Sequence, residues 1–545
     1  MTALVLGPCL RYVDSECATV WVETDGPCEV EILGHTAQTF SVEGHHYALV
    51  LIEDLTSGES REYQVSLDGR DVWPEPDSPF PPSTIRPHDP DRPFRLMFGS
   101  CRVAAPHEPP YTDPPGKNSR ALDVDALYAA GLRMIADASQ IPDAILFLGD
   151  QVYADDSVKG TREFPRDGTD ESEPPADEPA NFEEYTLLYL DAWSEPVMRW
   201  VLSTVQTTMI FDDHDVHDDW NTSGAWVEEI RRNPWWQERI VGALASYWVY
   251  QHLGNLSPSD LRSDPLFEKV RAAGDATSLL REYAARADLE TNGTRWSYHR
   301  DFGRTRLIVI DSRCGRVLDG ERKMVDDEEF DWIAEHVKGD FDHLLLASSV
   351  PFLLLPALHH IEAWSEAVCD GAWGKTAAKV GEKLRQAADL EHWAAFGASF
   401  ERLSALLADV SAGRLGRRPA SVVMLSGDVH HAYLAQVDFP PKAGARSPVY
   451  QAVCSPVRNP LPPMRQRIFR ASKSSAARRF GRWLARRAKV PPPVIGWTVE
   501  RGPWFYNQIA ELRLDGRTAR LQLERAERCP DGSPALAPVM DESLT

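Results

Sequence analysis

Carboxylate and imidazole side chains follow directly after apolar stretches of this chain. One stretch ends in a Gly-Asp pair at Asp150, and another ends in a Gly-Asp pair at Asp428, with His430 two residues beyond. Because side chains two positions apart on an extended chain point the same way, Asp428 and His430 can both reach one ion. A third stretch runs into the acidic and histidine-containing segment 212–215. Together these hard ligands predict a site for more than one metal ion.

The elements that must position these ligands are short buried strands. The apolar stretches 144–148, 207–211 and 421–426 are too short for free-standing helices and end abruptly. We interpret each as a strand that delivers a carboxylate to the carboxyl edge of a sheet, where ligands bind in open α/β sheets. So many carboxylates in one place cost electrostatic free energy unless cations bind there or the segment 212–219 is fully solvated.

Taken singly, each of these features has a plainer explanation. A Gly-Asp pair after a strand is commonly a turn, and an acidic segment is usually solvated. Cys101 on its own is more often a small buried apolar side chain than a ligand, and Tyr153 could simply pack its ring. The order and spacing of all the motifs together are more specific.

That combination resembles the alkaline phosphatase D (PhoD-like) family of metallophosphatases. The resemblance extends over residues 100–431 and rests on these motifs: Gly99-Ser100-Cys101-Arg102, Gly149-Asp150-Gln151-Val152-Tyr153, Asp212-Asp213-His214-Asp215 with Trp220, Ser349-Val350-Pro351-Phe352, and Gly427-Asp428-Val429-His430. It implies a four-layer α/β/β/α core with two metal ions, preceded by a small antiparallel β-sandwich. The implied activity is hydrolysis of phosphate esters, either monoesters, diesters or both.

The resemblance also implies a role for each matching residue. The assignments are Asp150 as the bridge between the ions, Cys101, Tyr153 and His430 as ligands of a ferric ion, Asp213 and Asp428 as ligands of a calcium ion, and His214 as the catalytic histidine near the leaving group. Thiolate and phenolate suit a strongly Lewis-acidic transition metal, whereas carboxylates alone suit calcium, magnesium or manganese. The expected cofactors are therefore Fe(3+) and Ca(2+), with manganese, magnesium or zinc as substitutes.

The reaction expected of such a centre is attack of hydroxide on phosphorus. Two ions about 3.5–4 Å apart can generate a hydroxide at neutral pH and clamp both the attacking and the leaving oxygen. If protonated, His214 could donate to the leaving alkoxide. Arg102 and Arg313 are candidates for binding the substrate phosphate, with a structural salt bridge as the alternative for each. The segment 217–219 offers either further ligands or part of a solvated loop.

Two departures from the family stand out. Family members are typically exported by a twin-arginine signal, whereas residues 1–8 contain no twin arginine, basic region or long apolar segment. We therefore expect a cytoplasmic enzyme. In addition, Asp215 stands where the family often has glutamate, which shortens any contact that its carboxylate makes.

Composition along the chain predicts three parts. Residues 1–71 contain short alternating strands, which predict the β-sandwich. Residues 72–92 are rich in proline and predict a linker. In residues 93–545 apolar strands alternate with helical segments, which predicts an α/β catalytic domain. Within that domain, residues 154–180 predict an acidic surface loop and residues 506–523 predict a closing hairpin.

The charge and cysteine content limit the possible functions. The formal net charge of −24 argues against nucleic-acid binding by the surface as a whole. An anionic substrate would then need a locally positive site, which bound metal ions can provide. The eight cysteines are scattered without CxxC pairs, so the sequence predicts free thiols rather than a disulfide framework.

One segment runs against the acidic trend. Residues 465–489 carry arginines and lysines without an acidic residue, and Phe480, Trp483 and Leu484 fall on one face of the expected helix. Such a helix could lie on an anionic membrane or bind another polyanion, as in a peripheral lipid or nucleotide phosphodiesterase. The alternative is that Phe480 and Trp483 pack against the protein's own acidic surface.

A binding protein is the second class of function that the sequence permits. It would be a catalytically silent metallophosphatase fold that contacts partners through its β-sandwich. However, every proposed ligand position holds a residue able to bind metal, whereas inactive relatives of enzymes usually lose some of these residues. The sequence therefore favours the enzyme.

Overall fold

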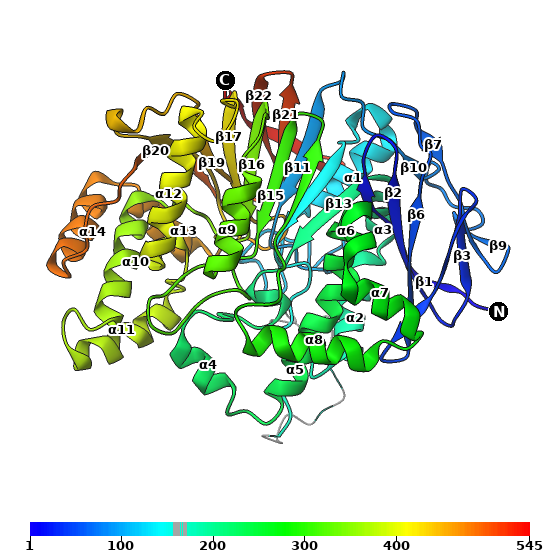
Figure 1. Cartoon of the computed structure of the whole chain (residues 1–545), viewed down its shortest axis with the longest axis horizontal. Coiled ribbons are helices and arrows are strands. Elements are labelled where there is room, and N and C mark those ends of the chain that lie inside the picture. Colours follow the sequence, from blue (N-terminus) through cyan, green and yellow to red (C-terminus); the bar gives the residue numbers. More distant parts are fainter. Residues whose placement is uncertain (156–163, 165, 167–171) are drawn as a thin grey trace.

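Two mixed β-sheets pack face to face in this computed structural model, which describes residues 1–155, 164, 166 and 172–545 (Figure 1). The first sheet has the order β13 (Gln206–Ile210), β12 (Ala144–Leu148), β11 (Phe94–Gly99), β21 (Gln508–Asp515), β22 (Thr518–Arg528) and β23 (Pro534–Ser543). The second has the order β14 (Tyr298–Phe302), β15 (Thr305–Ile310), β16 (His343–Ser348), β17 (Ser421–Ser426), β19 (Val449–Val453), β18 (Ala432–Asp438) and β20 (Gly496–Trp504).

The central strands are apolar throughout because both of their faces are buried. All residues of β12, β16 and β17 are buried, and these strands pair in parallel with their neighbours. Leu146, Leu345 and Val423 point into the core between the sheets, whereas Ile145 and Met424 contact the outer layers. Strands of this kind read as continuous apolar runs, as the sequence predicted.

Helices cover the outer faces of both sheets. The first sheet packs against α1 (Ala126–Ala136), α2 (Phe182–Trp193), α3 (Pro196–Thr204), α5 (Trp236–Tyr247) and α8 (Thr277–Leu289). The second packs against α9 (Asp327–His336) and α12 (Gly397–Ala412). Two short helices, α6 (Pro258–Ser263) and α7 (Pro265–Ala273), also contribute buried residues to the first of these layers. Further helices are α4 (Gly224–Ile230), α10 (Pro356–Cys369) and α11 (Lys375–Ala387). The predicted four-layer α/β/β/α core is therefore confirmed.

The N-terminal part of the chain folds as two small antiparallel sheets. One has the order β1 (Leu4–Val13), β2 (Ala18–Thr24), β6 (His45–Ile52) and β5 (Phe40–Val42), and the other β4 (His35–Gln38), β3 (Glu29–Ile32), β8 (Val65–Leu67) and β9 (Arg70–Trp73). Their inner faces share one apolar core, which confirms the β-sandwich. In the proline-rich segment 72–92, β10 (Thr84–Ile85) pairs with β7 (Arg61–Glu62).

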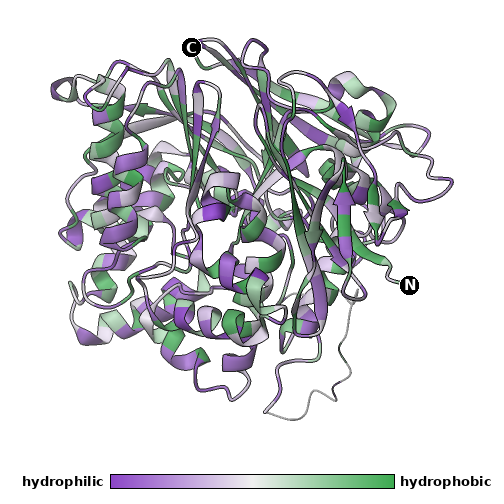
Figure 2. Ribbon diagram, turned by 45° about the vertical axis from the view of Figure 1, so that its right-hand side comes forward, coloured by the Kyte–Doolittle hydropathy of each residue, from purple (hydrophilic) through white to green (hydrophobic). Residues whose placement is uncertain are grey.

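The sandwich packs directly on the helices of the first sheet. The guanidinium of Arg11 is fully buried, and its Nη2 donates to the carbonyl of Gln251 at 2.7 Å. The ring of Trp21 lies 6.1 Å from that of Trp193 and 5.2 Å from that of Tyr250. Hydrophobic residues continue along the strands on both sides of this contact (Figure 2). The two parts therefore share one hydrophobic core.

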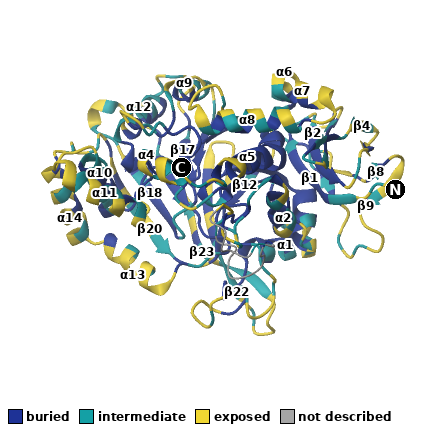
Figure 3. Cartoon of the chain, turned by 90° about the horizontal axis from the view of Figure 1, so that it is seen from below, coloured by how far each residue is buried: buried dark blue, intermediate teal, exposed yellow. Residues whose placement is uncertain are grey.

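The basic segment differs from its prediction. It forms two helices, α13 (Pro463–Ser472) and α14 (Ser475–Arg487), because the Ser474 side chain caps the start of the second helix. Phe480 and Trp483 are 56% and 51% exposed, so the prediction that they pack against the protein's own surface is wrong. The buried side of α14 is instead formed by small residues, including Gly481 and Ala485. Because their side chains are small or absent, α14 packs closely on α10. Figure 3 shows both helices largely in the colour of exposed residues.

Other predictions from the sequence have mixed outcomes. The closing hairpin is confirmed, with Asp515 paired to Thr518 across the turn between β21 and β22. All eight cysteines are free. Much of the predicted acidic loop at 154–180 lies outside the described residues. In the described part of the chain, the helices are either too short or too polar to cross a membrane.

Candidate metal centre

The loops that follow β11, β12, β13 and β17 meet at the carboxyl ends of these strands. They carry the predicted ligands Cys101, Asp150, Tyr153, Asp213, Asp428 and His430. The Sγ atom of Cys101 lies 3.5 Å from the carbonyl oxygen of Asp428 and 3.0 Å from the Oγ atom of Ser455. The backbone N–H of His430 donates to the same Ser455 Oγ at 3.2 Å. Cys101, Asp428 and His430 are therefore neighbours, although they come from different sheets.

The loops after β12 and β13 are joined by Asp215. Its carboxylate accepts hydrogen bonds from the backbone N–H groups of Asp150 at 2.9 Å, Gln151 at 3.1 Å and Asp212 at 2.9 Å. Gly149 makes this approach possible, since a Cβ atom there would lie 2.5 Å from the Cβ of Asp212. Asp215 thus holds the backbone that presents Asp150, without itself facing an ion site.

Several predicted ligands have a left-handed backbone. The φ angles are 57° at Cys101, 53° at Asp150, 65° at Asp428 and 50° at His430. Residues with side chains rarely adopt this region, and such strain is concentrated at functional sites. The convergence of four such residues on one place is independent support for a functional role.

Carboxylates are crowded in this centre. Asp150, Asp212 and Asp213 are buried, and each can offer an oxygen within 4.8 Å of the others. Burial raises the pKa of Asp150 well above its ordinary value, and the neighbouring carboxylates Asp212 and Asp213 raise it further. Burial, opposed by Arg313, raises the pKa of Asp212 to about 8. The Oδ1 atom of Asp150 and the Oδ2 atom of Asp212 are buried, and neither has a hydrogen-bond partner among the described residues. These are the properties of oxygens that a cation would neutralise, so the residues fit a metal site.

A thiol and a phenol lie against these carboxylates. The Oη atom of Tyr153 donates to Asp150 Oδ2 at 3.3 Å. Burial, together with Asp150, raises the pKa of both Cys101 and Tyr153 well above the ordinary values. A metal ion that binds them therefore has to displace their protons, which is the usual chemistry of thiolate ligands.

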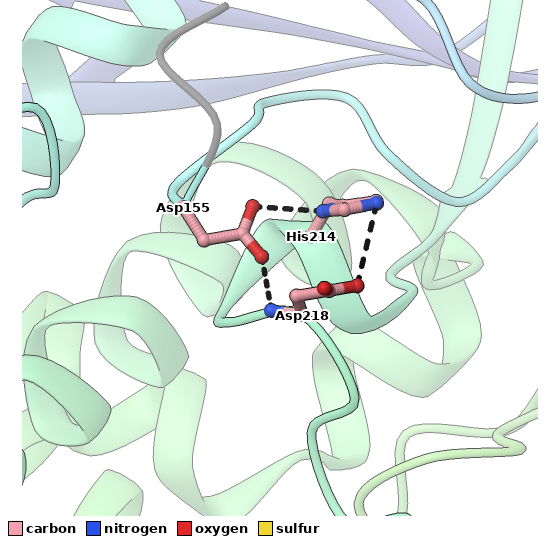
Figure 4. A group of neighbouring side chains, drawn as sticks. All are labelled: Asp155, His214 and Asp218. Atoms are coloured by element: carbon pink, nitrogen blue, oxygen red, sulfur yellow. Dashed lines mark hydrogen bonds and ion pairs between the residues drawn. The ribbon is translucent and has the colours of Figure 1, made fainter. Parts of the chain in front are cut away.

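His214 lies between two carboxylates at the edge of the centre (Figure 4). Its Nδ1 atom is 2.7 Å from Asp155 Oδ1, and its Nε2 atom is 3.9 Å from Asp218 Oδ1. Burial alone would lower the pKa of His214, but Asp155 and Asp213 raise it well above the ordinary value. The imidazole ring lies 4.7 Å from the ring of Tyr153. A protonated histidine is therefore available beside the predicted ligands.

Asp428 belongs to a second chain of polar contacts. Its Oδ2 atom lies 2.8 Å from Nε2 of His392, whose Nδ1 is 2.7 Å from Oε1 of Glu362. Burial alone would raise the pKa of Asp428, but the contact with His392 lowers it below its ordinary value. Asp428 is therefore held ionised and in one orientation.

Both arginines considered for phosphate binding are engaged with acidic residues. Arg313 is fully buried and forms ion pairs with Asp212, with Asp213 at 3.2 Å and with Glu391 at 2.6 Å. Arg102 pairs with Asp125 at 2.9 Å and donates to a backbone carbonyl. Each arginine thus forms the salt bridge that the sequence offered as the alternative to phosphate binding.

Three residues of the centre were missed by sequence reasoning. Asp155 lies at the start of the acidic insertion, where its carboxylate did not stand out from its neighbours. Glu391 and His392 lie between helices α11 and α12, outside every strand-end motif. Only the pairing of an acid with a histidine at 391–392 was a signal, and it is a weak one.

Comparisons with known proteins agree with this architecture. A family model described as PhoD-like phosphatase matches residues 125–485, and one described as a domain of unknown function (DUF7800) matches residues 1–85. The solved structure of PhoD superposes with a TM-score of 0.57 at 12% identity, over 99% of this chain and 92% of PhoD. The structure of purple acid phosphatase PPD1 from yellow lupin (Lupinus luteus) seeds superposes with a TM-score of 0.49 at 10% identity, over 99% of this chain and 74% of the lupin chain. A search of curated proteins gives no match.

The four-layer fold of this chain is that of the solved structure of PhoD. Because the PhoD-like phosphatase model matches well over half of the chain, the chain belongs to the PhoD-like phosphatase family and is a phosphoric ester hydrolase. The resemblance inferred from the motifs is thereby confirmed.

Proposed function

We propose that this protein hydrolyses phosphate monoesters, diesters or both, in a metal-dependent reaction at the centre around Asp150. The observation that carries the proposal is the convergence of four strand-end loops on buried carboxylate oxygens that lack a hydrogen-bond partner in the part of the chain that the structure describes. Membership of the PhoD-like phosphatase family supports the reaction class.

The proposed ligands follow the assignment made from the motifs. They are Cys101, Tyr153 and His430 for a ferric ion, Asp213 and Asp428 for a calcium ion, and Asp150 for both, with manganese, magnesium or zinc as substitutes. When bound, such ions supply Lewis acidity and a hydroxide nucleophile at neutral pH. The mixture of thiol, phenol and imidazole on one side and carboxylates on the other supports a site with two different ions.

His214 is proposed to protonate the leaving oxygen. Its raised pKa keeps the imidazole protonated at neutral pH, and the contact of Asp155 with Nδ1 fixes the ring orientation. Nε2, which lies 3.9 Å from Asp218, is then the atom available to donate a proton. We do not include Arg102 in the substrate site, because its guanidinium is paired with Asp125.

The test compares a nitrophenyl phosphate monoester with the corresponding diester. The purified chain is loaded with iron and calcium, and turnover is measured for the wild type, for Asp150→Asn and for Asp331→Asn, a carboxylate 80% exposed on the surface. We expect turnover in the wild type and in the surface variant but not in Asp150→Asn, and the ratio of the two rates distinguishes phosphatase from phosphodiesterase activity. Unchanged turnover in Asp150→Asn, or none in a wild type shown to hold both metals, would contradict the proposal.

A further inference from the structure

Helix α14 and the loop after it form an unusually basic surface. The chain has a net charge of −24, yet residues 463–499 contain no acidic residue. Arg478, Arg482 and Arg486 are exposed and spaced four residues apart, so they line one side of the helix. Within the described residues, none of the three takes part in an ion pair that would neutralise it.

These arginines line a groove of about 640 Å³ between α14 and residues 490–497. Burial lowers the pKa of Arg482, and the neighbouring Arg478 and Arg486 lower it further. The Nε atom of Arg482 lies 3.2 Å from Nε2 of His360, which is not a charge partner. Three arginines thus line the groove against one carboxylate, that of Asp438, with which none of them forms an ion pair among the described residues. This excess of positive charge favours an anion as ligand.

Two aromatic side chains extend the exposed side of α14 beyond the row of arginines. The rings of Phe480 and Trp483 are 6.0 Å apart, 56% and 51% exposed, and nearly parallel at 24°. They do not hold the helix in place, because α14 packs on α10 through Gly481, where a Cβ would lie 2.9 Å from the carbonyl oxygen of Ala357. Val494, in the loop that closes the groove, is 49% exposed. Apolar surface of this kind carries a free-energy cost in water that a partner would remove.

We propose that the α14 face, defined as Arg478, Phe480, Arg482, Trp483 and Arg486, docks on the surface of an anionic phospholipid bilayer. A soluble polyanion would use only the arginines, whereas a bilayer uses both kinds of side chain. The arginines bind lipid phosphates, and the aromatic rings enter the interface below the headgroups. The acidic remainder of the protein is repelled by the same lipids, which orients this face toward them.

The α14 face is connected to the candidate metal centre through α13. Burial and Glu391 raise the pKa of Asp389 to about 6, and Arg465 in the first turn of α13 acts in the opposite direction. Arg465 is therefore within electrostatic range of the centre. The docking itself does not depend on catalysis.

The test is flotation of the full-length chain with vesicles, which is independent of activity. The vesicles contain either phosphatidylcholine alone or equal parts of phosphatidylcholine and phosphatidylglycerol, and heparin serves as the soluble polyanion. The chain is expected to float with the anionic vesicles only. Each basic residue near an anionic surface contributes about fivefold to partitioning. A triple Arg→Gln variant at 478, 482 and 486 should therefore partition about a hundredfold more weakly.

Two further variants make the test specific. The double variant Phe480→Ser and Trp483→Ser should lose at least about tenfold in vesicle binding while heparin binding is unchanged. The matched control removes three exposed arginines that have acidic partners, Arg92, Arg304 and Arg414, and should bind vesicles as the wild type does. The proposal is overturned if anionic vesicles do not bind the wild type, if the control loses as much as the triple variant, or if the double variant binds vesicles normally.

Discussion

Replacing Asp150 by asparagine is expected to stabilise the metal-free protein while abolishing metal binding. Asp150 is 2% exposed, and its Oδ1 atom has no hydrogen-bond partner within residues 1–155, 164, 166 and 172–545. Burial and the carboxylates of Asp212 and Asp213 raise its pKa, so its charged form is disfavoured in the folded state. Asparagine has the same shape, carries no charge and offers an N–H donor to the neighbouring carboxylates.

The size of the effect follows from the single unpaired atom. A buried polar atom without a partner costs about 1–3 kcal/mol, so Asp150→Asn should gain about that much in the presence of a chelator. For a chain of this size the melting temperature should rise by roughly 1–4 °C, measured by differential scanning fluorimetry. With iron and calcium each at about 100 times its Kd, each ion adds about 2.7 kcal/mol, so the wild type gains about 5 kcal/mol while the variant gains nothing, and the order reverses.

A surface variant and the metal dependence together test this reasoning. Asp331→Asn removes a carboxylate that is 80% exposed. It should change the melting temperature by no more than the error of the measurement, both in chelator and with iron and calcium added. If Asp150→Asn lowers the melting temperature in chelator, the carboxylate has a stabilising partner in the metal-free fold and the argument from crowding is refuted.

Three further variants test the proton donor, a buried ion-pair network and a histidine–glutamate contact within the N-terminal part of the chain. His214→Asn should lower kcat by about 10²–10⁴-fold while the metal content measured by mass spectrometry is unchanged. Glu391→Gln removes the negative charge that pairs with two buried arginines. It should destabilise the fold by about 3–5 kcal/mol, seen as a lower melting temperature. A hydrogen bond to Glu23 raises the pKa of His45 to about 9, so the stability it contributes is complete below about pH 6.5 and is lost as the pH rises through 9. Below about pH 6.5, His45→Gln should therefore lower the free energy of unfolding by about 1–2 kcal/mol, a figure that allows for solvent screening. The difference in melting temperature from the wild type should shrink as the pH rises from there through 9.

Each of these has a result that contradicts it. Loss of metal from His214→Asn would make that histidine a ligand rather than a proton donor. A wild-type melting temperature in Glu391→Gln would show that the arginines do not need its charge. A His45→Gln difference that is constant from pH 6 to 10 would exclude the contact with Glu23 as its cause.

The strands and their terminal carboxylates were predictable because their signal is local. Continuous apolar residues ending in Gly149 and Gly427 follow from burial on both faces of a parallel strand and from the space that only glycine leaves at the strand end. The same local signal placed Asp150 and Asp428 at the centre. Family motifs then related these residues to Cys101, which no periodicity connects to them.

The remaining contacts depend on tertiary structure. His392 reaches Asp428 from a loop between two helices, and Asp155 reaches His214 from the edge of the acidic insertion, so neither has a pattern in the sequence. The amphipathic pattern of α14 allowed Phe480 and Trp483 either to face an anionic partner or to pack against the protein's own acidic surface. The close approach of α10 is instead made at Gly481, and the aromatic rings are left in solvent.

The metal content of the wild type and of Asp150→Asn tests the central claim most directly. Both proteins, loaded with iron and calcium and passed through a desalting column, are analysed by plasma mass spectrometry, with Asp331→Asn as the matched control. Because Asp150 is proposed to bridge the ions, we predict that the wild type and the control retain iron and calcium and that Asp150→Asn loses both. Equal retention of both metals in Asp150→Asn and in the wild type would contradict a metal centre built around this carboxylate.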